Sequence, residues 1–147
     1  MKFKLPFIIA EIGINHDGKF SLAKKLVMMA KKGGADAVKF QIFDPHRLVA
    51  DKKQMFSYGI LKNRETGETE IVEEPLFDIL VRRCLTGDEW REVKEFCDSL
   101  NIAFFSTVAF DEDIKLLEKI GCVSVKIASA DINHFPLLRS VAKTGMC

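Results

Sequence analysis

The sequence predicts an α/β protein built on a parallel sheet, and two observations support this fold class. Four short runs are rich in β-branched and aromatic residues, and they are apolar almost throughout, as is typical of strands covered on both faces. Segments with helical spacing of apolar residues separate these runs. The four predicted strands are residues 7–12, 37–42, 103–108 and 123–128.

Each predicted helix carries a terminal signal. Thr86 and Glu89 have the spacing of a capping box. The acidic residues 111–113 lie where the helix dipole favours negative charge, and Pro136 falls in a first turn, where proline is tolerated. The predicted helices span residues 21–32, 86–100, 111–121 and 135–143.

Alternation of strands and helices predicts right-handed βαβ units, either in an open doubly wound sheet or in part of a (β/α)8 TIM barrel. A full barrel takes about 250 residues. The 147 residues hold only about the first four βα units. We therefore expect residues 1–147 to form the N-terminal half of a barrel domain, truncated before its fifth strand.

A long insert, residues 44–85, follows the second predicted strand. It contains a possible hairpin, with strands 56–61 and 68–72 around the polar turn 62–67, and then a short helix at 75–83. Loops of this length in compact domains are usually functional or disordered. A lid over the C-terminal face of the sheet and a tolerated surface insertion are equally compatible with the sequence.

Composition narrows the classes of partner and compartment. Lys plus Arg total 22 and Asp plus Glu total 21, so we expect no nucleic-acid partner and no anionic membrane. No apolar run approaches the roughly 20 residues of a membrane span, and no secretory signal is recognisable, so we expect a cytoplasmic protein. The four cysteines lack a Cys-x-x-Cys spacing, and we expect them to be buried small hydrophobes.

Polar residues gather at the C-terminal ends of the predicted strands, where α/β proteins bind ligands. Lys39 and Gln41 are two residues apart and therefore share a face, and a lysine buried there needs an anionic partner. Lys126 lies at the corresponding end of the fourth strand. With nearby hydroxyls, the two lysines predict a pocket for a small phosphate- or carboxylate-bearing substrate. The hydroxyls are those of Thr107 and Ser129, and Ser106 also lies at the end of the third predicted strand.

An internal ion pair is the alternative to this pocket. Glu11 could pair with either lysine and satisfy the charges with no ligand present. His16, in a turn after the first strand, is expected to be a loop residue rather than a ligand. His46 and His134 lack partners at metal-ligand spacing, so no metal site is predicted in this chain.

Three ordered motifs make the sequence more specific. They are residues 8–18 (IIAEIGINHDG), 34–41 (GADAVKFQ) and 126–131 (KIASAD), the last followed by Pro136-Leu137-Leu138. Together they resemble the sialic acid synthase family, which includes N-acetylneuraminate, legionaminic acid and pseudaminic acid synthases. The resemblance extends from Phe7 to the C-terminus, except for the insert.

The resemblance implies a (β/α)8 barrel enzyme that condenses phosphoenolpyruvate with an N-acetylated amino sugar such as N-acetylmannosamine. The products would be a nine-carbon 2-keto acid and inorganic phosphate. A divalent metal, Mn²⁺ or Mg²⁺, would polarise the sugar aldehyde, with its histidine ligands in the second barrel half and none in this chain. The resemblance also implies a homodimer in which a C-terminal antifreeze-like domain closes the partner's site.

The resemblance also assigns roles to residues. Two acidic residues would lie close to the reacting centre, four residues would hold phosphoenolpyruvate, and Gln41 would lie near the sugar. The acidic residues are Glu11 and Asp131, and the phosphoenolpyruvate ligands are Lys39, Thr107, Lys126 and Ser129. Two departures from the family stand in the sequence: the segment 106–111 (STVAFD) has no proline and is one residue longer, and Ala130 replaces a common glycine.

Two other functions stay open at this stage. One is a Schiff-base aldolase in which Lys126 or Lys39 is the nucleophilic amine. The other is non-catalytic: a half-barrel fragment that serves as a binding or assembly module.

Overall fold

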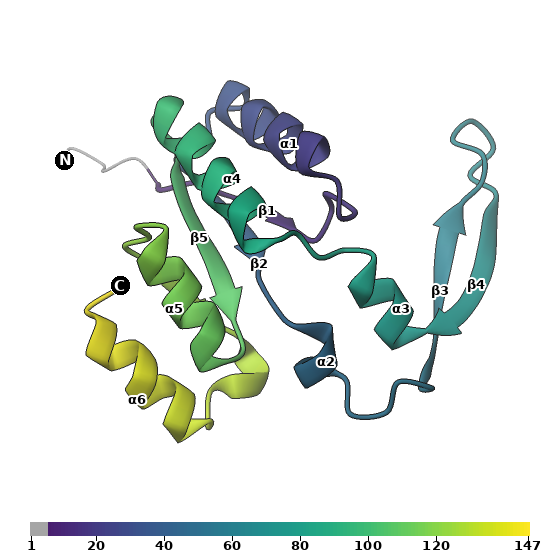
Figure 1. Cartoon of the computed structure of the whole chain (residues 1–147). Helices are drawn as coiled ribbons and strands as arrows, with labels where there is room; N and C mark the ends of the chain where they lie inside the picture. The colour runs from purple at the N-terminus through teal and green to yellow at the C-terminus, as the bar shows by residue number, and fades with distance from the viewer. Residues whose placement is uncertain (1–5) are drawn as a thin grey trace. The chain divides into compact units, whose positions relative to one another are not determined.

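The computed structural model describes residues 6–147. They form two compact units (Figure 1). The first unit contains the chain up to Phe43 and then Cys84–Cys147, and the second is Asp44–Arg83.

The first unit is built on a four-stranded parallel sheet with the strand order β1-β2-β5-β6. Each of these strands lies beside the one before it in the unit, with no reversal of direction along the sheet. A doubly wound sheet reverses its strand order at a switch point, whereas a barrel does not. The order therefore favours the barrel over the open sheet. The strands are β1 (Ile9–Gly13), β2 (Ala37–Gln41), β5 (Ala103–Val108) and β6 (Val125–Ile127).

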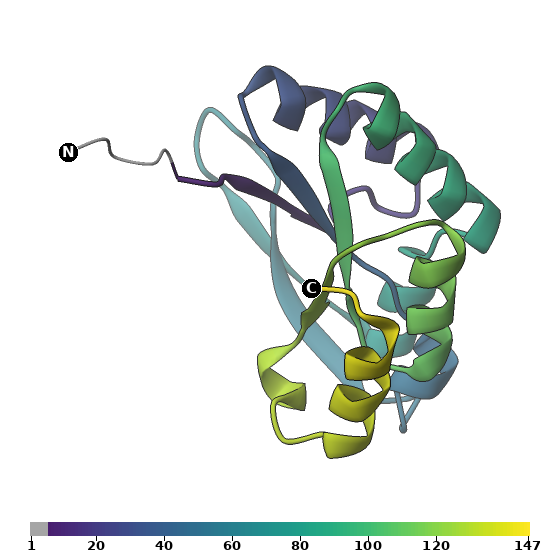
Figure 2. The same cartoon turned by 90° about the vertical axis from the view of Figure 1, so that its left-hand side faces the viewer.

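Helices follow the strands and lie along one face of this sheet (Figure 2). All four predicted helices are confirmed, with ends that differ from the expected ones by at most two residues. A short 3-10 turn, η1 (Ser129–Asp131), follows β6. The helices are α1 (Phe20–Lys32), α4 (Gly87–Ser99), α5 (Asp111–Lys119) and α6 (Phe135–Thr144).

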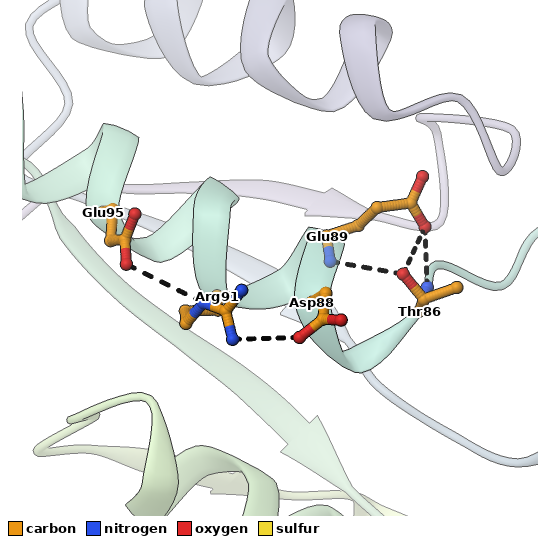
Figure 3. A network of polar contacts seen from close by, with 5 residues as sticks. All are labelled: Thr86, Asp88, Glu89, Arg91 and Glu95. Atoms are coloured by element: carbon orange, nitrogen blue, oxygen red, sulfur yellow. Dashed lines mark hydrogen bonds and ion pairs between the residues drawn. The ribbon is translucent and has the colours of Figure 1, made fainter.

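The start of α4 shows how local sequence sets a helix boundary (Figure 3). The Thr86 hydroxyl accepts a hydrogen bond of 3.2 Å from the Glu89 amide, and the Glu89 carboxylate accepts one of 2.8 Å from the Thr86 amide. These two bonds satisfy main-chain donors that would otherwise lack partners at the helix end. Arg91 pairs with Asp88 one turn earlier. The predicted capping box is confirmed.

Alternate residues of the strands form the core against the helices. Phe40 of β2 stacks on Phe104 of β5 with ring centroids 5.4 Å apart, and Trp90 of α4 meets Phe40 edge-on at 5.3 Å. All three rings are buried. Aromatic pairs at these separations stabilise a core beyond their buried area. The face toward the helices is therefore apolar, and the opposite face carries Lys39 and its neighbours.

The cysteines divide into two kinds. Cys97 and Cys122 are buried in the core, and burial raises the pKa of each thiol to about 12, which leaves both inert. Cys147 is exposed, so the expectation that every cysteine is buried is wrong. Its main chain forms hydrogen bonds with Val123 and Val125. All four cysteines, including the partly buried Cys84, are free thiols.

The second unit contains the predicted hairpin, made of the antiparallel strands β3 (Met55–Leu61) and β4 (Thr69–Pro75). β4 continues three residues beyond its expected end, so α3 (Leu76–Val81) begins at Leu76. A further short helix, α2 (Pro45–Leu48), was not predicted. The lid function of this unit stays a prediction.

The capping box leads to a stability prediction. Thr86→Ala removes the hydroxyl acceptor and should lower the free energy of unfolding by about 1 kcal/mol. The matched control is Glu92→Ala, on the exposed side of the same helix, which should change it by less than about 0.5 kcal/mol. Urea denaturation at a protein concentration that gives monomers checks both values. Equal losses in the two variants would contradict the assigned role of the cap.

Candidate functional site

Lys39 is the centre of a polar cluster on the face of the sheet opposite the helices. Its ammonium nitrogen lies 2.6 Å from Glu11 Oε2 on β1 and 3.5 Å from Thr107 Oγ1 on β5. The Lys39 side chain is 8% exposed, whereas that of Glu11 is 63% exposed. A buried ammonium needs a charged partner, because moving an unpaired charge from water into the protein interior costs a large amount of free energy. The parallel register supplies that partner by placing Glu11 directly beside Lys39.

The ion pair predicted as the alternative to a pocket is therefore present, and its lysine is Lys39.

Lys126, in contrast, has no such partner among the described residues. Register places Gln41, Thr107 and Lys126 side by side on β2, β5 and β6, so all three share the face that carries Lys39. Among residues 6–147, Lys126 has no ion pair, and its side chain is only partly buried. A cation without a carboxylate partner thus lies at the strand ends.

Gly13 lies beside Gln41 and was not predicted as a site residue. A Cβ atom built on Gly13 would lie 3.5 Å from Gln41 Oε1, and the φ of +56° at this position favours glycine. The register between β1 and β2 also shifts here, between Glu11 and Gly13. Its position in the sequence could have identified it. Gly13 lies two residues after Glu11, and residues two apart in a strand are on the same face.

Ser129 and Asp131 lie in η1, directly after β6, and thus at the same end of the sheet. Ser129 is exposed and Asp131 is partly buried. In the part of the chain that the structure describes, no hydrogen bond or ion pair joins either side chain to Lys39 or Glu11. The structure therefore brings Glu11, Lys39 and Thr107 into contact. Ser129 and Asp131 lie at the same end of the sheet but make no such contact within residues 6–147.

Ser106 is not part of this cluster, although it is adjacent to Thr107. Its side chain is fully buried on the helix side of β5. The hydroxyl accepts a hydrogen bond of 2.9 Å from the Ile42 amide and donates one of 2.9 Å to the Thr107 carbonyl. Its role is to tie the end of β2 to β5. It faces away from the Lys39 cluster because successive residues of a strand point to opposite faces.

His16 lies in the turn after β1, as expected, and its side chain is fully buried. Its ring lies 5.9 Å from the Phe40 ring and 5.4 Å from the Trp90 ring, centroid to centroid. Neither ring nitrogen has a hydrogen-bond partner among the described residues. Burial lowers the pKa of His16, although Asp17 and Glu89 act to raise it. A neutral imidazole thus anchors the loop after β1 in the core.

A cavity of about 460 Å³ lies at the other end of the sheet. Its lining includes Ile9, Ala37 and Ala103, the first residues of β1, β2 and β5. It is therefore distinct from the Lys39 cluster. Within residues 6–147 no three His, Cys, Asp or Glu side chains are grouped so that they could hold a metal ion, and no helix is long and apolar enough to cross a membrane.

The strand order, the helices along one face and the basic strand ends on the other are those of a segment of a (β/α)8 barrel. The chain belongs to the NeuB family, whose model matches residues 26–146. This confirms both the expected fold class and the resemblance to the sialic acid synthase family. Solved structures of related sialic acid synthase barrels contain the same arrangement, of which this chain covers only a part.

Three similar proteins illustrate the match. An N,N'-diacetyllegionaminic acid synthase from Legionella pneumophila is 36% identical, over 96% of this chain and 40% of its own length. Spore coat polysaccharide biosynthesis protein SpsE from Bacillus subtilis is 38% identical, over 93% and 34%. The crystal structure of N-acetylneuraminic acid (sialic acid) synthetase from Leptospira borgpetersenii, in complex with citrate, is 26% identical with a TM-score of 0.77, and covers 97% and 43%. The chain thus spans well under half the length of these relatives.

The buried His16 leads to a prediction about pH. Because its pKa is lower in the folded than in the unfolded chain, protons bind preferentially to the unfolded chain. The free energy of unfolding should fall as pH drops below about 6.5 and level off below the folded-state pKa. His16→Leu should remove this part of the pH dependence while retaining the fold at pH 7, because leucine has a similar volume and buries no polar atom.

Urea titrations of the wild type and His16→Leu between pH 7 and pH 5 measure this difference. Both proteins keep Asp17 and Glu89, so the His16 imidazole is the titratable group that differs between them. Parallel curves over the whole range would show that His16 does not titrate with folding.

Proposed function

We propose that this chain supplies the phosphoenolpyruvate-binding part of an enzyme that condenses phosphoenolpyruvate with an N-acetylated amino sugar. The products would be a nine-carbon sialic-acid-type 2-keto acid and inorganic phosphate. The observation that carries the proposal is the partly buried Lys126, which shares a sheet face with Lys39 and has no carboxylate partner among residues 6–147. The NeuB family membership and the 36%-identical legionaminic acid synthase support it.

The charges of the cluster suit this substrate. Phosphoenolpyruvate carries a carboxylate and a phosphate, and lysine ammonium groups bind both as strong charge-assisted partners. Lys126 would hold one anionic group together with the hydroxyl of Thr107, its neighbour in register. Lys39 would share its ammonium between Glu11 and the substrate. Ser129, exposed just beyond β6, would add a further hydroxyl.

The remaining side chains suit the sugar and the proton transfers. The Gln41 amide can donate and accept hydrogen bonds, as sugar hydroxyls require. The overall reaction joins the enol carbon to the sugar aldehyde carbon and adds water, and it then breaks the C–O bond to phosphate. Carboxylates can move the protons of such steps. Glu11 and Asp131 are the candidates for that role.

Several components of this proposal lie outside the described residues. Residues 6–147 do not provide a ligand set for the expected Mn²⁺ or Mg²⁺ ion. Residues beyond this chain would hold the metal ion, which would supply the positive charge that polarises the sugar aldehyde. The homodimer and the cytoplasmic location expected from the sequence belong to the same proposal.

Lys126→Ala tests the binding of phosphoenolpyruvate. Loss of one charge-assisted contact should cost about 1.5 to 3 kcal/mol, which is an increase of about 10- to 150-fold in Kd by calorimetry. The matched control, Lys25→Ala, removes an exposed lysine of α1 and should leave Kd unchanged. An unchanged Kd in Lys126→Ala would contradict its assignment. Covalent trapping of a keto acid on Lys126 by borohydride would instead favour the aldolase.

The 147-residue chain by itself should not catalyse the condensation. Phosphoenolpyruvate, N-acetylmannosamine and Mn²⁺ added to the purified chain should give no sugar-dependent release of phosphate, because its described residues hold no metal ligand set. The chain should also self-associate, since β1 and β6 each pair on one side only in the sheet described. Phosphate release combined with light scattering checks both expectations. Sugar-dependent turnover by a monodisperse monomer would overturn them.

A further inference from the structure

The hairpin of the second unit has one strand edge with no protection against pairing. Among the described residues, β3 pairs only with β4 (Figure 1). The Lys62 amide donates to the Glu68 carbonyl at 2.8 Å, and the Leu76 amide donates to the Gln54 carbonyl at 2.9 Å. In an antiparallel ladder the hydrogen-bonded pairs alternate with pairs whose main-chain groups point outward. The outward main-chain groups of β3 therefore belong to Met55, Ser57, Gly59 and Leu61.

The two outer edges of the hairpin differ in charge. β3 contains no charged residue over its seven positions. β4 carries Glu70, Glu73 and Glu74 and ends at Pro75, which has no amide hydrogen. Charged residues and proline are the usual means of blocking an exposed edge. β4 is thus protected, and β3 is not.

The β3 edge is complementary to itself. When two copies of β3 pair antiparallel with Tyr58 on the two-fold axis, Met55 lies opposite Leu61 and Ser57 lies opposite Gly59. All four outward residues of each copy then form hydrogen-bonded pairs, which gives about eight hydrogen bonds across the interface. A shift of the register by two residues leaves some of these groups unpaired.

Side chains on both faces also match in this register. Phe56, 48% exposed, lies opposite Ile60, 38% exposed, and cross-strand pairs of this kind stabilise sheets. On the other face, the exposed Met55 and Leu61 are opposite each other. The corresponding symmetric pairing of β4 would set Glu70 opposite Glu74 twice, and like charges directly opposite are destabilising.

We propose that the β3 edge is an interface for a second copy of this chain, with antiparallel β3–β3 pairing centred on Tyr58. The result is a four-stranded antiparallel sheet built from two hairpins. An isolated two-stranded hairpin is only marginally stable in water, and independent stability needs three or more strands with a hydrophobic face or packing against a helix. The interface is independent of the function proposed for the Lys39 cluster.

Site-specific cross-linking tests this register. Tyr58→Cys places the two thiols opposite each other in a non-hydrogen-bonded pair, where Cβ atoms approach closely enough for a disulfide. The matched control is Val72→Cys, because Val72 lies directly opposite Tyr58 within the hairpin and would be on the axis of a β4–β4 dimer. Both variants are made with Cys84→Ser and Cys147→Ser, which removes the two native thiols that are not buried. Under mild oxidation, Tyr58→Cys should form disulfide dimers at least tenfold faster than Val72→Cys.

Proline substitutions then separate the two edges. Gly59 and Ile71 are opposite each other, and both amides point away from the hairpin ladder, so proline at either position spares the β3–β4 bonds. Gly59→Pro, combined with Tyr58→Cys, should abolish the cross-link, whereas Ile71→Pro should not. Ser57→Lys provides a second block of the β3 edge that does not depend on proline. Cross-linking that is no faster than in Val72→Cys, or that survives both Gly59→Pro and Ser57→Lys, would overturn the proposed interface.

Discussion

The ion pair between Lys39 and Glu11 is the interaction on which the polar face of the sheet depends. It joins neighbouring strands across a parallel register, and its lysine is almost fully buried. Because an unpaired buried ammonium is so unfavourable, this pair restricts how β1 and β2 can be aligned. A shift of one residue would place Lys39 on the helix face, among aromatic rings. The strand register and the position of the site lysine thus both depend on the ion pair between Lys39 and Glu11.

The core below the sheet holds the other part of the site in place. Phe40 lies between Lys39 and Gln41 in the sequence and projects to the opposite face, where it contacts His16 and Trp90. The loop after β1 is therefore fixed by the same aromatic ring that separates the two site residues of β2. A neutral histidine without hydrogen bonds is a costly residue to bury. Its position links the stability of this loop, which follows Glu11, to pH.

The second unit obeys different constraints. Its strands have no helix layer of their own and are only two in number, so main-chain pairing at the edges matters more than packing of a core. Its charges are distributed unevenly, with the glutamates on β4 and none on β3. Such a distribution protects one edge and leaves the other available to a partner strand. The proposed interface follows from the outward direction of alternate main-chain groups on β3 and from the absence of charged side chains on that strand.

The sequence by itself determined the features that depend on local spacing. The strands of the parallel sheet, the four helices packed on it, the capping box at Thr86 and the hairpin follow from apolar periodicity and terminal residues. The short helix α2 was not predicted, and β4 extends three residues beyond its expected end. Clustering of Lys39, Thr107 and Lys126 on one sheet face was also predictable, because parallel strands end at the same edge. Family membership was predictable from three ordered motifs.

Only the tertiary structure decided which groups touch. It selected Lys39 rather than Lys126 as the partner of Glu11, because register along the sheet sets distances that sequence spacing does not. It buried His16, since Phe40 and Trp90 come from segments far along the chain. It turned Ser106 away from the site and left Cys147 exposed. Each outcome depends on contacts between distant segments, whereas local patterns record only the preferences of neighbouring residues.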